Sequence, residues 1–142
     1  MRNIKFVLIP CGKRKREKSA PAKDLYTSAL FKRHRAYAES LGAPWFILSA
    51  KHGLLHPDEL VEPYNVTMNK MPKSAREDWS LRVQRQLDPH IELTGNTVVM
   101  TCGVNYQSGL LEWFQLRGVH VYLPLKGVGL FKQSARLKEL MP

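Results

Sequence analysis

Four short apolar runs, separated by longer segments of helical character, constrain the fold of this chain more than any other feature. The runs span Ile4–Ile9, Trp45–Leu48, Thr97–Thr101 and Val119–Leu123. Each run is apolar almost throughout, as expected of strands that are buried on both faces of a sheet. Strands that alternate with helices form right-handed βαβ units, and these give a parallel sheet. We therefore predict an α/β fold: one three-layer domain over residues 1–142, with a four-stranded, mainly parallel sheet flanked by helices.

The segments between the runs carry the predicted helices. Residues 24–41 form a helix whose inner face bears four large side chains, with Gly42 as its stop. These four are Tyr26, Leu30, Tyr37 and Leu41. Two further helices are predicted over residues 108–117 and 130–140, each following one of the later apolar runs.

A capping box opens the predicted helix in the middle of the chain. Ser74 and Glu77 have the three-residue spacing at which two side chains cap a helix N-terminus reciprocally. The helix that follows is predicted to turn Trp79, Val83 and Leu87 toward the core.

The net charge is the strongest feature of the composition. Lys and Arg number 22 against 12 Asp and Glu, which gives a net charge of +10 at pH 7. Such a charge attracts polyanions, so we predict nucleic acid or a nucleotide as the partner. The alternative is a basic surface that only keeps the protein in solution.

No apolar run approaches the roughly 18 residues that cross a membrane, so no membrane partner is expected. Met1–Pro10 is basic and then briefly apolar, but it lacks a longer apolar segment and a small-residue cleavage site. It is therefore interpreted as a first core strand, and we expect a cytoplasmic monomer. Cys11 and Cys102 are too few for a disulfide scaffold.

Ligands of open parallel sheets bind outside the carboxyl ends of the strands, so the loops after the four runs are the candidate site. The first loop places five cations within six residues, just after a Cys-Gly turn. Backbone amides freed by glycine, together with Lys or Arg, are suited to phosphate. The candidate binding residues are therefore Cys11, Gly12, Lys13 and Arg14. No Walker-type spacing follows, which argues against ATP hydrolysis.

The second loop, which begins with Ser-Ala-Lys-His-Gly-Leu-Leu, gathers the most chemistry. Hydroxyl, ammonium, imidazole, carboxylate and phenol groups follow the strand end closely, at Ser49, Lys51, His52, Asp58, Glu62 and Tyr64. They supply a general acid or base, a group to position water and a ring for stacking. Gly53 indicates a backbone shape that a side chain would block.

The third and fourth loops add groups that could read a base and hold an anion. Asn105 and Tyr106 can hydrogen-bond to a base edge and stack on it. Cys102 repeats the Cys-Gly ending of the first loop, and the two thiols could pair or join a histidine at zinc, although the spacing matches no usual ligand pattern. Lys126 and Gly127 precede the last helix, where glycines and lysine suit an anion.

These loops resemble a bacterial and phage family of domains with no assigned function. The resemblance rests on five motifs that cover nearly the whole chain: Cys11-Gly12, Asp24-Leu25-Tyr26, Ser49-Ala50-Lys51-His52-Gly53-Leu54, Glu62-Pro63-Tyr64 and Pro124-Leu125-x-Gly127-x-Gly129. That family is distantly similar to the uracil-DNA-glycosylase-like α/β domain, which also occurs in archaeal proteins that modify tRNA bases.

The resemblance implies a glycosylase-type fold and a substrate related to a nucleobase. The chain has no Gly-x-Asp-Pro-Tyr after its first strand and no His-Pro-Ser before its last helix, which argues against uracil specificity. It also lacks the four cysteines of the iron–sulfur glycosylases, so we expect no cluster and no other cofactor or metal. Occurrence in phages and their hosts suggests a modified base and a role in antiviral defence.

The expected reaction is hydrolysis of the N-glycosidic bond of a base flipped out of DNA. Bond cleavage builds positive charge on the sugar, and Asp58 or Glu62 would stabilise that charge or orient water. His52 or Lys51 would assist the departing base. Tyr64 and Tyr106 would stack on the base. Lys13, Arg14 and Lys126 would bind phosphates.

Two other function classes fit the same residues. One is a module that binds DNA, RNA or a nucleotide without chemistry, because no single motif demands catalysis. The other is an N-ribosidase or deoxyribosyltransferase that acts on free nucleotides. A nuclease is disfavoured, because Asp58, Glu59 and Glu62 on one loop make a poor two-metal site.

Overall fold

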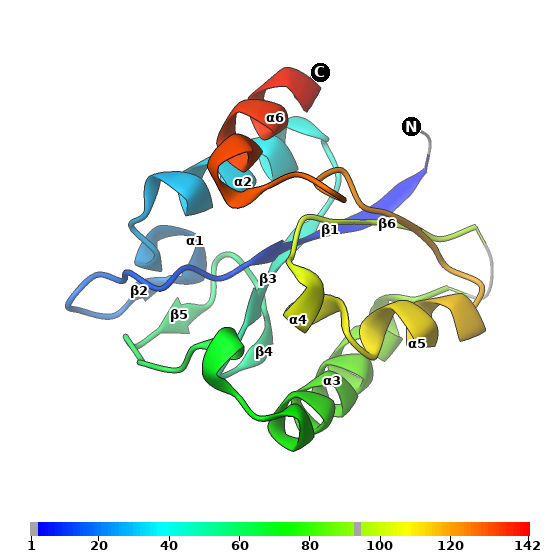
Figure 1. Cartoon of the computed structure of the whole chain (residues 1–142), viewed down its shortest axis with the longest axis horizontal. Coiled ribbons are helices and arrows are strands. Elements are labelled where there is room, and N and C mark those ends of the chain that lie inside the picture. The colour runs from blue at the N-terminus through cyan, green and yellow to red at the C-terminus, as the bar shows by residue number, and fades with distance from the viewer. Residues whose placement is uncertain (1–2, 93–94) are drawn as a thin grey trace.

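The computed structural model describes residues 3–92 and 95–142, and a five-stranded sheet forms its centre (Figure 1). The strands lie in the order β4 (Gly53–Leu55), β3 (Trp45–Ser49), β1 (Ile4–Pro10), β6 (Thr97–Met100) and β7 (His120–Tyr122). Four of them are parallel, and β4 runs antiparallel to β3. The predicted α/β class and mostly parallel sheet are confirmed. The predicted count of four strands is wrong, because the chain turns back after β3 and adds β4 at the edge.

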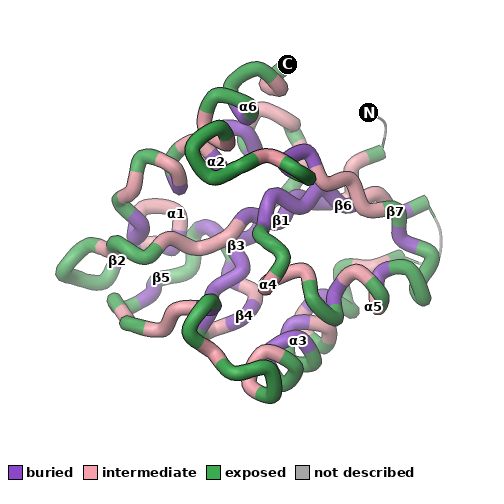
Figure 2. Tube along the Cα trace, viewed as in Figure 1, coloured by how far each residue is buried: buried purple, intermediate pink, exposed green. Residues whose placement is uncertain are grey.

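The central strand β1 is covered on both faces, as its continuous apolar sequence predicts. Its residues from Phe6 to Ile9 are at most 1% exposed. Leu8 lies between Phe46 of β3 and Met100 of β6, its register partners on the two parallel neighbours. The burial trace shows this central position directly (Figure 2).

Helices form the two outer layers of the three-layer domain. On one face, α2 (Ala29–Ser40) and α6 (Gln133–Leu140) pack against Val7 and Ile9. On the other, α3 (Lys73–Leu87) and α5 (Leu110–Leu116) pack against Phe6 and Leu8. The inward positions predicted for α3 are confirmed, since its side chains with at most 3% exposure include Trp79, Val83 and Leu87.

Short elements connect these layers. They are β2 (Ala20–Pro21), α1 (Ala22–Leu25), β5 (Leu60–Val61), η1 (Met68–Lys70), η2 (Asp88–His90), α4 (Val104–Gln107) and η3 (Leu130–Lys132). β2 and β5 pair antiparallel beside the main sheet. No helix within the described ranges combines the length and apolar character that a membrane crossing requires.

The helix predicted over residues 24–41 is two helices, α1 and α2. Tyr26 adopts extended backbone angles and pairs with Lys15, which interrupts the helix. Ser28 then begins α2, since its hydroxyl accepts a hydrogen bond from the Phe31 amide at 3.1 Å. Gly42 follows the helix with a φ of +71°, consistent with the predicted stop. The later start changes the buried face, which consists of Phe31, His34, Tyr37 and Ala38.

Three other helix predictions need correction. α3 begins at Lys73 after Pro72 with no side-chain cap, so the capping box of Ser74 and Glu77 is not formed. The helix predicted over 108–117 is present as α5 but begins two residues later, because Gly109, with a φ of +83°, precedes it and separates it from α4. The final helical segment is a 3-10 turn, η3, followed by the α-helix α6.

A buried polar pair ties α2 to the sheet. His34 is 2% exposed, and its Nδ1 lies 2.8 Å from Thr101 Oγ1 directly after β6. Burial lowers the pKa of His34 to about 4, below the value of about 6.5 expected in the unfolded chain. The unfolded chain therefore takes up a proton at His34 more readily than the folded protein does.

This pair predicts acid sensitivity. The stabilisation is complete above pH 6.5 and is lost as the pH falls toward 4, because the unfolded state binds the extra proton. We expect His34 to lower the free energy of unfolding by about 2 kcal/mol between pH 7 and pH 5, measured by urea denaturation. His34→Gln should remove this component, whereas replacement of the exposed His120 by Gln should leave it in place. Equal pH dependence in His34→Gln and the unmodified protein would contradict the assignment.

Candidate functional site

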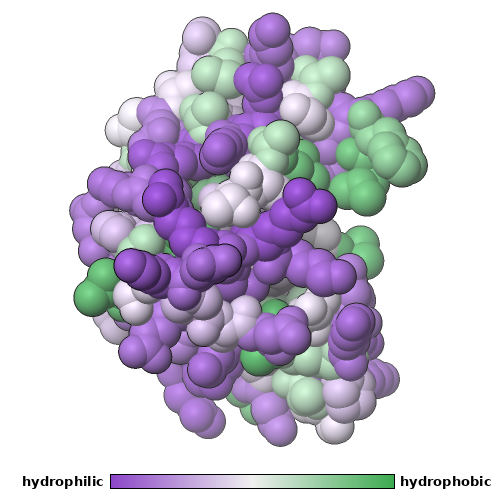
Figure 3. Space-filling view, turned by 90° about the vertical axis from the view of Figure 1, so that its left-hand side faces the viewer, coloured by the Kyte–Doolittle hydropathy of each residue, from purple (hydrophilic) through white to green (hydrophobic). Residues whose placement is uncertain are grey.

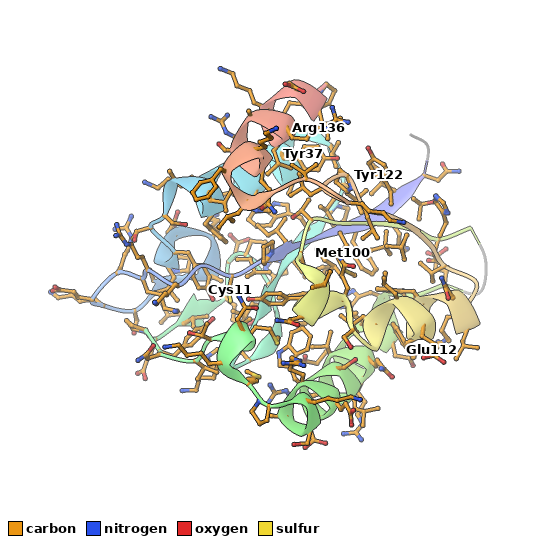
Figure 4. All side chains as sticks on the ribbon, in the orientation of Figure 1. Cys11, Tyr37, Met100, Glu112, Tyr122 and Arg136 are labelled. Carbon is orange, nitrogen blue, oxygen red and sulfur yellow. The ribbon has the colours of Figure 1, made fainter. Side chains whose placement is uncertain are left out.

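The first and third loops meet where the parallel strands β1 and β6 end, as the topology predicts. Cys11, labelled in Figure 4, follows β1, and its amide donates to the Leu48 carbonyl of β3 at 3.0 Å. Its Sγ shares a hydrogen bond of 3.2 Å with the Tyr106 hydroxyl on α4. The Tyr106 ring also packs edge-on against Trp79 of α3, with 5.7 Å between centroids. Cys11 thus lies at the point where three strand ends come together.

A chain of three hydroxyls joins the end of β3 to the end of α1. Ser49 Oγ lies 2.7 Å from Tyr64 Oη, which lies 2.6 Å from Tyr26 Oη. The same Ser49 oxygen accepts hydrogen bonds from the amides of Lys51 and His52 at 3.2 and 3.0 Å. Because these amides occupy its acceptor positions, the Ser49 hydroxyl donates to Tyr64, and Tyr64 donates to Tyr26.

A cation and an imidazole flank the central phenol of this chain. Lys15 Nζ lies 4.3 Å from the centroid of the Tyr64 ring, a cation–π distance. The His52 ring meets Tyr64 edge-on at 5.3 Å. Partial burial lowers the pKa of Lys15, and burial raises the pKa of Tyr26 and Tyr64. The phenols therefore keep their protons at neutral pH and act as hydrogen-bonding groups.

His52 is neutral at pH 7, because partial burial and then the neighbouring Lys51 charge lower its pKa. The carboxylate that opposes this shift is Glu59, not Asp58 or Glu62. A neutral imidazole can donate one hydrogen bond and accept another. Lys51 itself is exposed.

The two predicted catalytic carboxylates lie on the segment around β5. Asp58 Oδ1 forms an ion pair of 2.7 Å with Lys23 Nζ of α1, and this contact lowers the pKa of the carboxyl group. Glu62 is exposed directly after β5. Among the described residues, no hydrogen bond or ion pair joins either carboxylate to His52.

The other predicted residues occupy two places at the same side of the sheet. Asn105 donates from its amide to Asn69 Oδ1 at 2.8 Å, which ties α4 to η1. Lys126 is exposed in the turn after β7, where Gly127 has a φ of +76°.

Both cysteines are free thiols, and within the described ranges no three His, Cys, Asp or Glu side chains are grouped to hold a metal ion.

A cavity of about 350 Å³ opens beside the first loop, against α2. Its lining combines the predicted binding residues with side chains of the helix: Pro10, Cys11, Gly12, Lys13, Arg14, Ser28, Leu30, Phe31 and His34. Gly12 allows the backbone of the first loop to pass close to Tyr26, because a Cβ at position 12 would lie 3.3 Å from Tyr26 Cβ. The structure thus brings all four predicted residues of the first loop to one cavity.

The backbone of the second loop is held by side chains of α3. Gln86 Nε2 donates to the His52 carbonyl at 3.1 Å, and Gln86 Oε1 accepts from the Leu54 amide at 2.9 Å. Trp79 Nε1 donates to the Ser49 carbonyl at 2.8 Å. In the conformation that these hydrogen bonds stabilise, Gly53 has a φ of +75° and faces Gln86.

Gly53→Ala tests this arrangement. A Cβ at position 53 would collide with Gln86 Oε1, in a backbone conformation that side chains already disfavour. We expect the free energy of unfolding to fall by about 2 to 3 kcal/mol, measured by urea denaturation. Gly42→Ala is the matched control, because φ is +71° there but nothing lies within 4 Å of the added Cβ. It should lose only about 1 kcal/mol, and an equal loss in both variants would exclude the Gln86 contact as the cause.

Comparison with known proteins places these elements in a family. Residues 6–139 match the model of DUF6884, a family of unknown function. The chain belongs to this family. The DUF6884 match includes every site residue named above, from Cys11 to Gly127. The chain is also 33% identical over 141 residues to the uncharacterized protein YfjM of Bacillus subtilis (strain 168), across 92% of this chain and 91% of that protein. No solved structure matches this DUF6884 chain.

Four residues of the site are not indicated as site residues by the sequence patterns described above, namely Lys15, Tyr26, His34 and Glu59. The single helix predicted from residue 24 assigned Tyr26 to the core-facing side and left His34 off that side. Ser28, a residue type that favours the N-cap position, is the signal that would have shown the later helix start. A helix capped at Ser28 places Phe31 and His34 one turn apart on its buried face. Lys15 was treated only as one charge of the basic loop, although it lies over Tyr64.

Proposed function

We propose that this DUF6884 protein hydrolyses the N-glycosidic bond between a base and its sugar in DNA. A modified base is the favoured substrate. The observation that carries the proposal is the adjacency of two features at the carboxyl edge of the sheet. One is the cavity beside the first loop, and the other is the chain from Ser49 to Tyr26 with neutral His52 beside it. The likeness to uracil-DNA-glycosylase-like domains, drawn from the sequence motifs, belongs to the same proposal.

The net charge and the cations at the cavity support a polyanionic substrate. The chain carries a net charge of +10, and hydrophilic side chains cover most of the face that bears β2, β5 and α1 (Figure 3). Exposed Lys13 and Arg14 stand at the cavity beside the start of α2. Phosphates of DNA would bind at these cations, and this binding should weaken steeply with salt.

The proposed reaction adds water across the bond between the sugar C1′ and the base nitrogen. The water oxygen bonds to C1′, the C1′–N bond breaks, and the departing base nitrogen takes up a proton. Neutral His52 donates a hydrogen bond to the leaving base, with Lys51 as the alternative donor. Glu62 is the freer of the two predicted carboxylates for orienting water, because Asp58 is paired with Lys23.

A binding module without chemistry is the second candidate, and one observation favours it. The hydroxyl chain of Ser49, Tyr64 and Tyr26 contains no carboxylate, and Asp58 is neutralised by Lys23. Such a site could recognise a nucleotide by hydrogen bonds and stacking alone.

A base-release assay with His52→Ala separates these candidates. DNA duplexes and single strands with modified and unmodified bases are incubated with the protein, and free base and alkali-labile abasic sites are measured. We expect release by the unmodified protein and a loss of 100-fold or more in His52→Ala, the usual range for a general acid–base group. DNA affinity should change little, and replacement of the exposed His120 by Ala should leave both properties unchanged.

Three other outcomes would replace the proposal. DNA binding without base release from any substrate would indicate the binding module. Faster cleavage of mononucleotides than of DNA at matched concentration would indicate a nucleotide N-ribosidase or deoxyribosyltransferase. Base release that persists unchanged in His52→Ala would remove His52 from the reaction.

A further inference from the structure

The cavity beside the first loop contains one buried histidine that neither the fold nor the proposed reaction explains fully. We propose that this cavity is the base-binding pocket and that His34 hydrogen-bonds the edge of the base. The inference rests on the base-recognition part of the proposed function and adds the place where the base binds. It also names a specificity residue, since His34 would distinguish one base edge from another.

The ring nitrogens of His34 have different surroundings. Nδ1 is bonded to Thr101 Oγ1 at 2.8 Å, which fixes the orientation of the ring. Nε2 has no hydrogen-bond partner among the described residues, yet no fully buried side-chain nitrogen or oxygen in those residues is left unsatisfied. Nε2 therefore keeps some contact with solvent. Since His34 is only 2% exposed and lines the cavity, the cavity is where Nε2 can meet a ligand.

The walls of the cavity suit a planar, uncharged ring. Pro10, Leu30 and Phe31 supply apolar surface, and the volume of about 350 Å³ lies at the small end of the range of roughly 300 to 1,000 Å³ for small-molecule pockets. Apolar walls with a few fixed polar groups are typical of sites that recognise a base by its edge. Burial also lowers the pKa of His34 to about 4, so the imidazole that meets the ligand is neutral.

Cations are present only at the outer part of this lining. Lys13 and Arg14 are exposed, whereas His34 and Phe31 are buried. A base inserted toward His34 would therefore leave its phosphates near the cations of the first loop, in keeping with the strength of charge-assisted bonds to phosphate. A phosphate inside the cavity would instead face a neutral imidazole and apolar side chains.

The position of the cavity also fits the proposed reaction. Cys11 lines the cavity, and its Sγ also shares a hydrogen bond with the Tyr106 hydroxyl. The next residue, Gly12, lines the cavity too and lies against Tyr26 of the hydroxyl chain. Gly12 therefore contacts both the cavity and Tyr26, whose hydroxyl is bonded to that of Tyr64 beside His52.

The direct test is the His34 ring in solution, observed by ¹⁵N NMR of the histidine side chains. The probes, each at millimolar concentration, are adenosine, guanosine, cytidine, thymidine and uridine, with 5-hydroxymethyl pyrimidine nucleosides and 7-deaza purine nucleosides. Ribose 5-phosphate and inorganic phosphate complete the set. We expect at least one nucleoside to shift Nε2 of His34, with no shift from ribose 5-phosphate or phosphate. A shift of equal size with phosphate alone, or none with any nucleoside, would overturn the assignment.

Leu30→Trp provides a variant that fills the pocket from its half-exposed rim without touching the buried pair. It should weaken nucleoside binding at least 10-fold while the thermal unfolding midpoint stays within a few degrees. Leu116→Trp is the matched control, because Leu116 is 79% exposed on α5, on the opposite face of the sheet. It should bind as the unmodified protein does.

Base release, measured in the same variants, separates this inference from the proposed function. If Leu30→Trp released base as fast as the unmodified protein, the pocket assignment would fall and the hydrolase would stand. If no substrate lost a base but nucleosides still shifted His34 and Leu30→Trp abolished the shift, the pocket would stand and the hydrolase would fall. His34→Gln, which keeps a hydrogen-bonding side chain, should change the ranking of nucleosides more than their overall affinity.

Discussion

The burial of β1 between two parallel neighbours is the constraint on which the rest of the molecule depends. The strand is apolar on both faces, so helices must cover each side, and its backbone groups must pair with β3 and β6. Parallel neighbours place all three carboxyl ends at one edge. Residues as distant in sequence as Cys11 and Tyr106 consequently meet there, whatever else their loops contain.

The groups that meet at this edge are mostly uncharged. Buried or half-buried phenols, a serine hydroxyl and two neutral imidazoles lie there, while most cations of the chain are at the periphery. Lys15 is the exception, since it lies over the aromatic face of Tyr64 rather than beside a carboxylate. Under the proposed function this division favours recognition of a nucleotide, because an uncharged base can be desolvated far more readily than its phosphates can.

The layer architecture could be predicted from the sequence because it follows from hydrophobic periodicity, which is local. The inward face of α3 was predicted from the same pattern. The reversal after β3 was not, because Gly53 to Leu55 is too short a run to distinguish a strand from a loop. The loops of the site were located by topology, whereas their contacts were not. The pairing of Asp58 with Lys23 depends on how β2 and β5 come together, which no local pattern encodes.

The hydrogen bonds from α3 to the second loop have a consequence for variation among relatives. Trp79, Arg82 and Gln86 all bind main-chain carbonyls of the loop, those of Ser49, Lys51 and His52. Main-chain atoms are the same whatever residue occupies a position, so the loop would keep its path if the side chains at positions 51 and 52 were exchanged. The scaffold can therefore present different reactive groups at one fixed point in space, and members of the family could differ in chemistry while sharing the same fold.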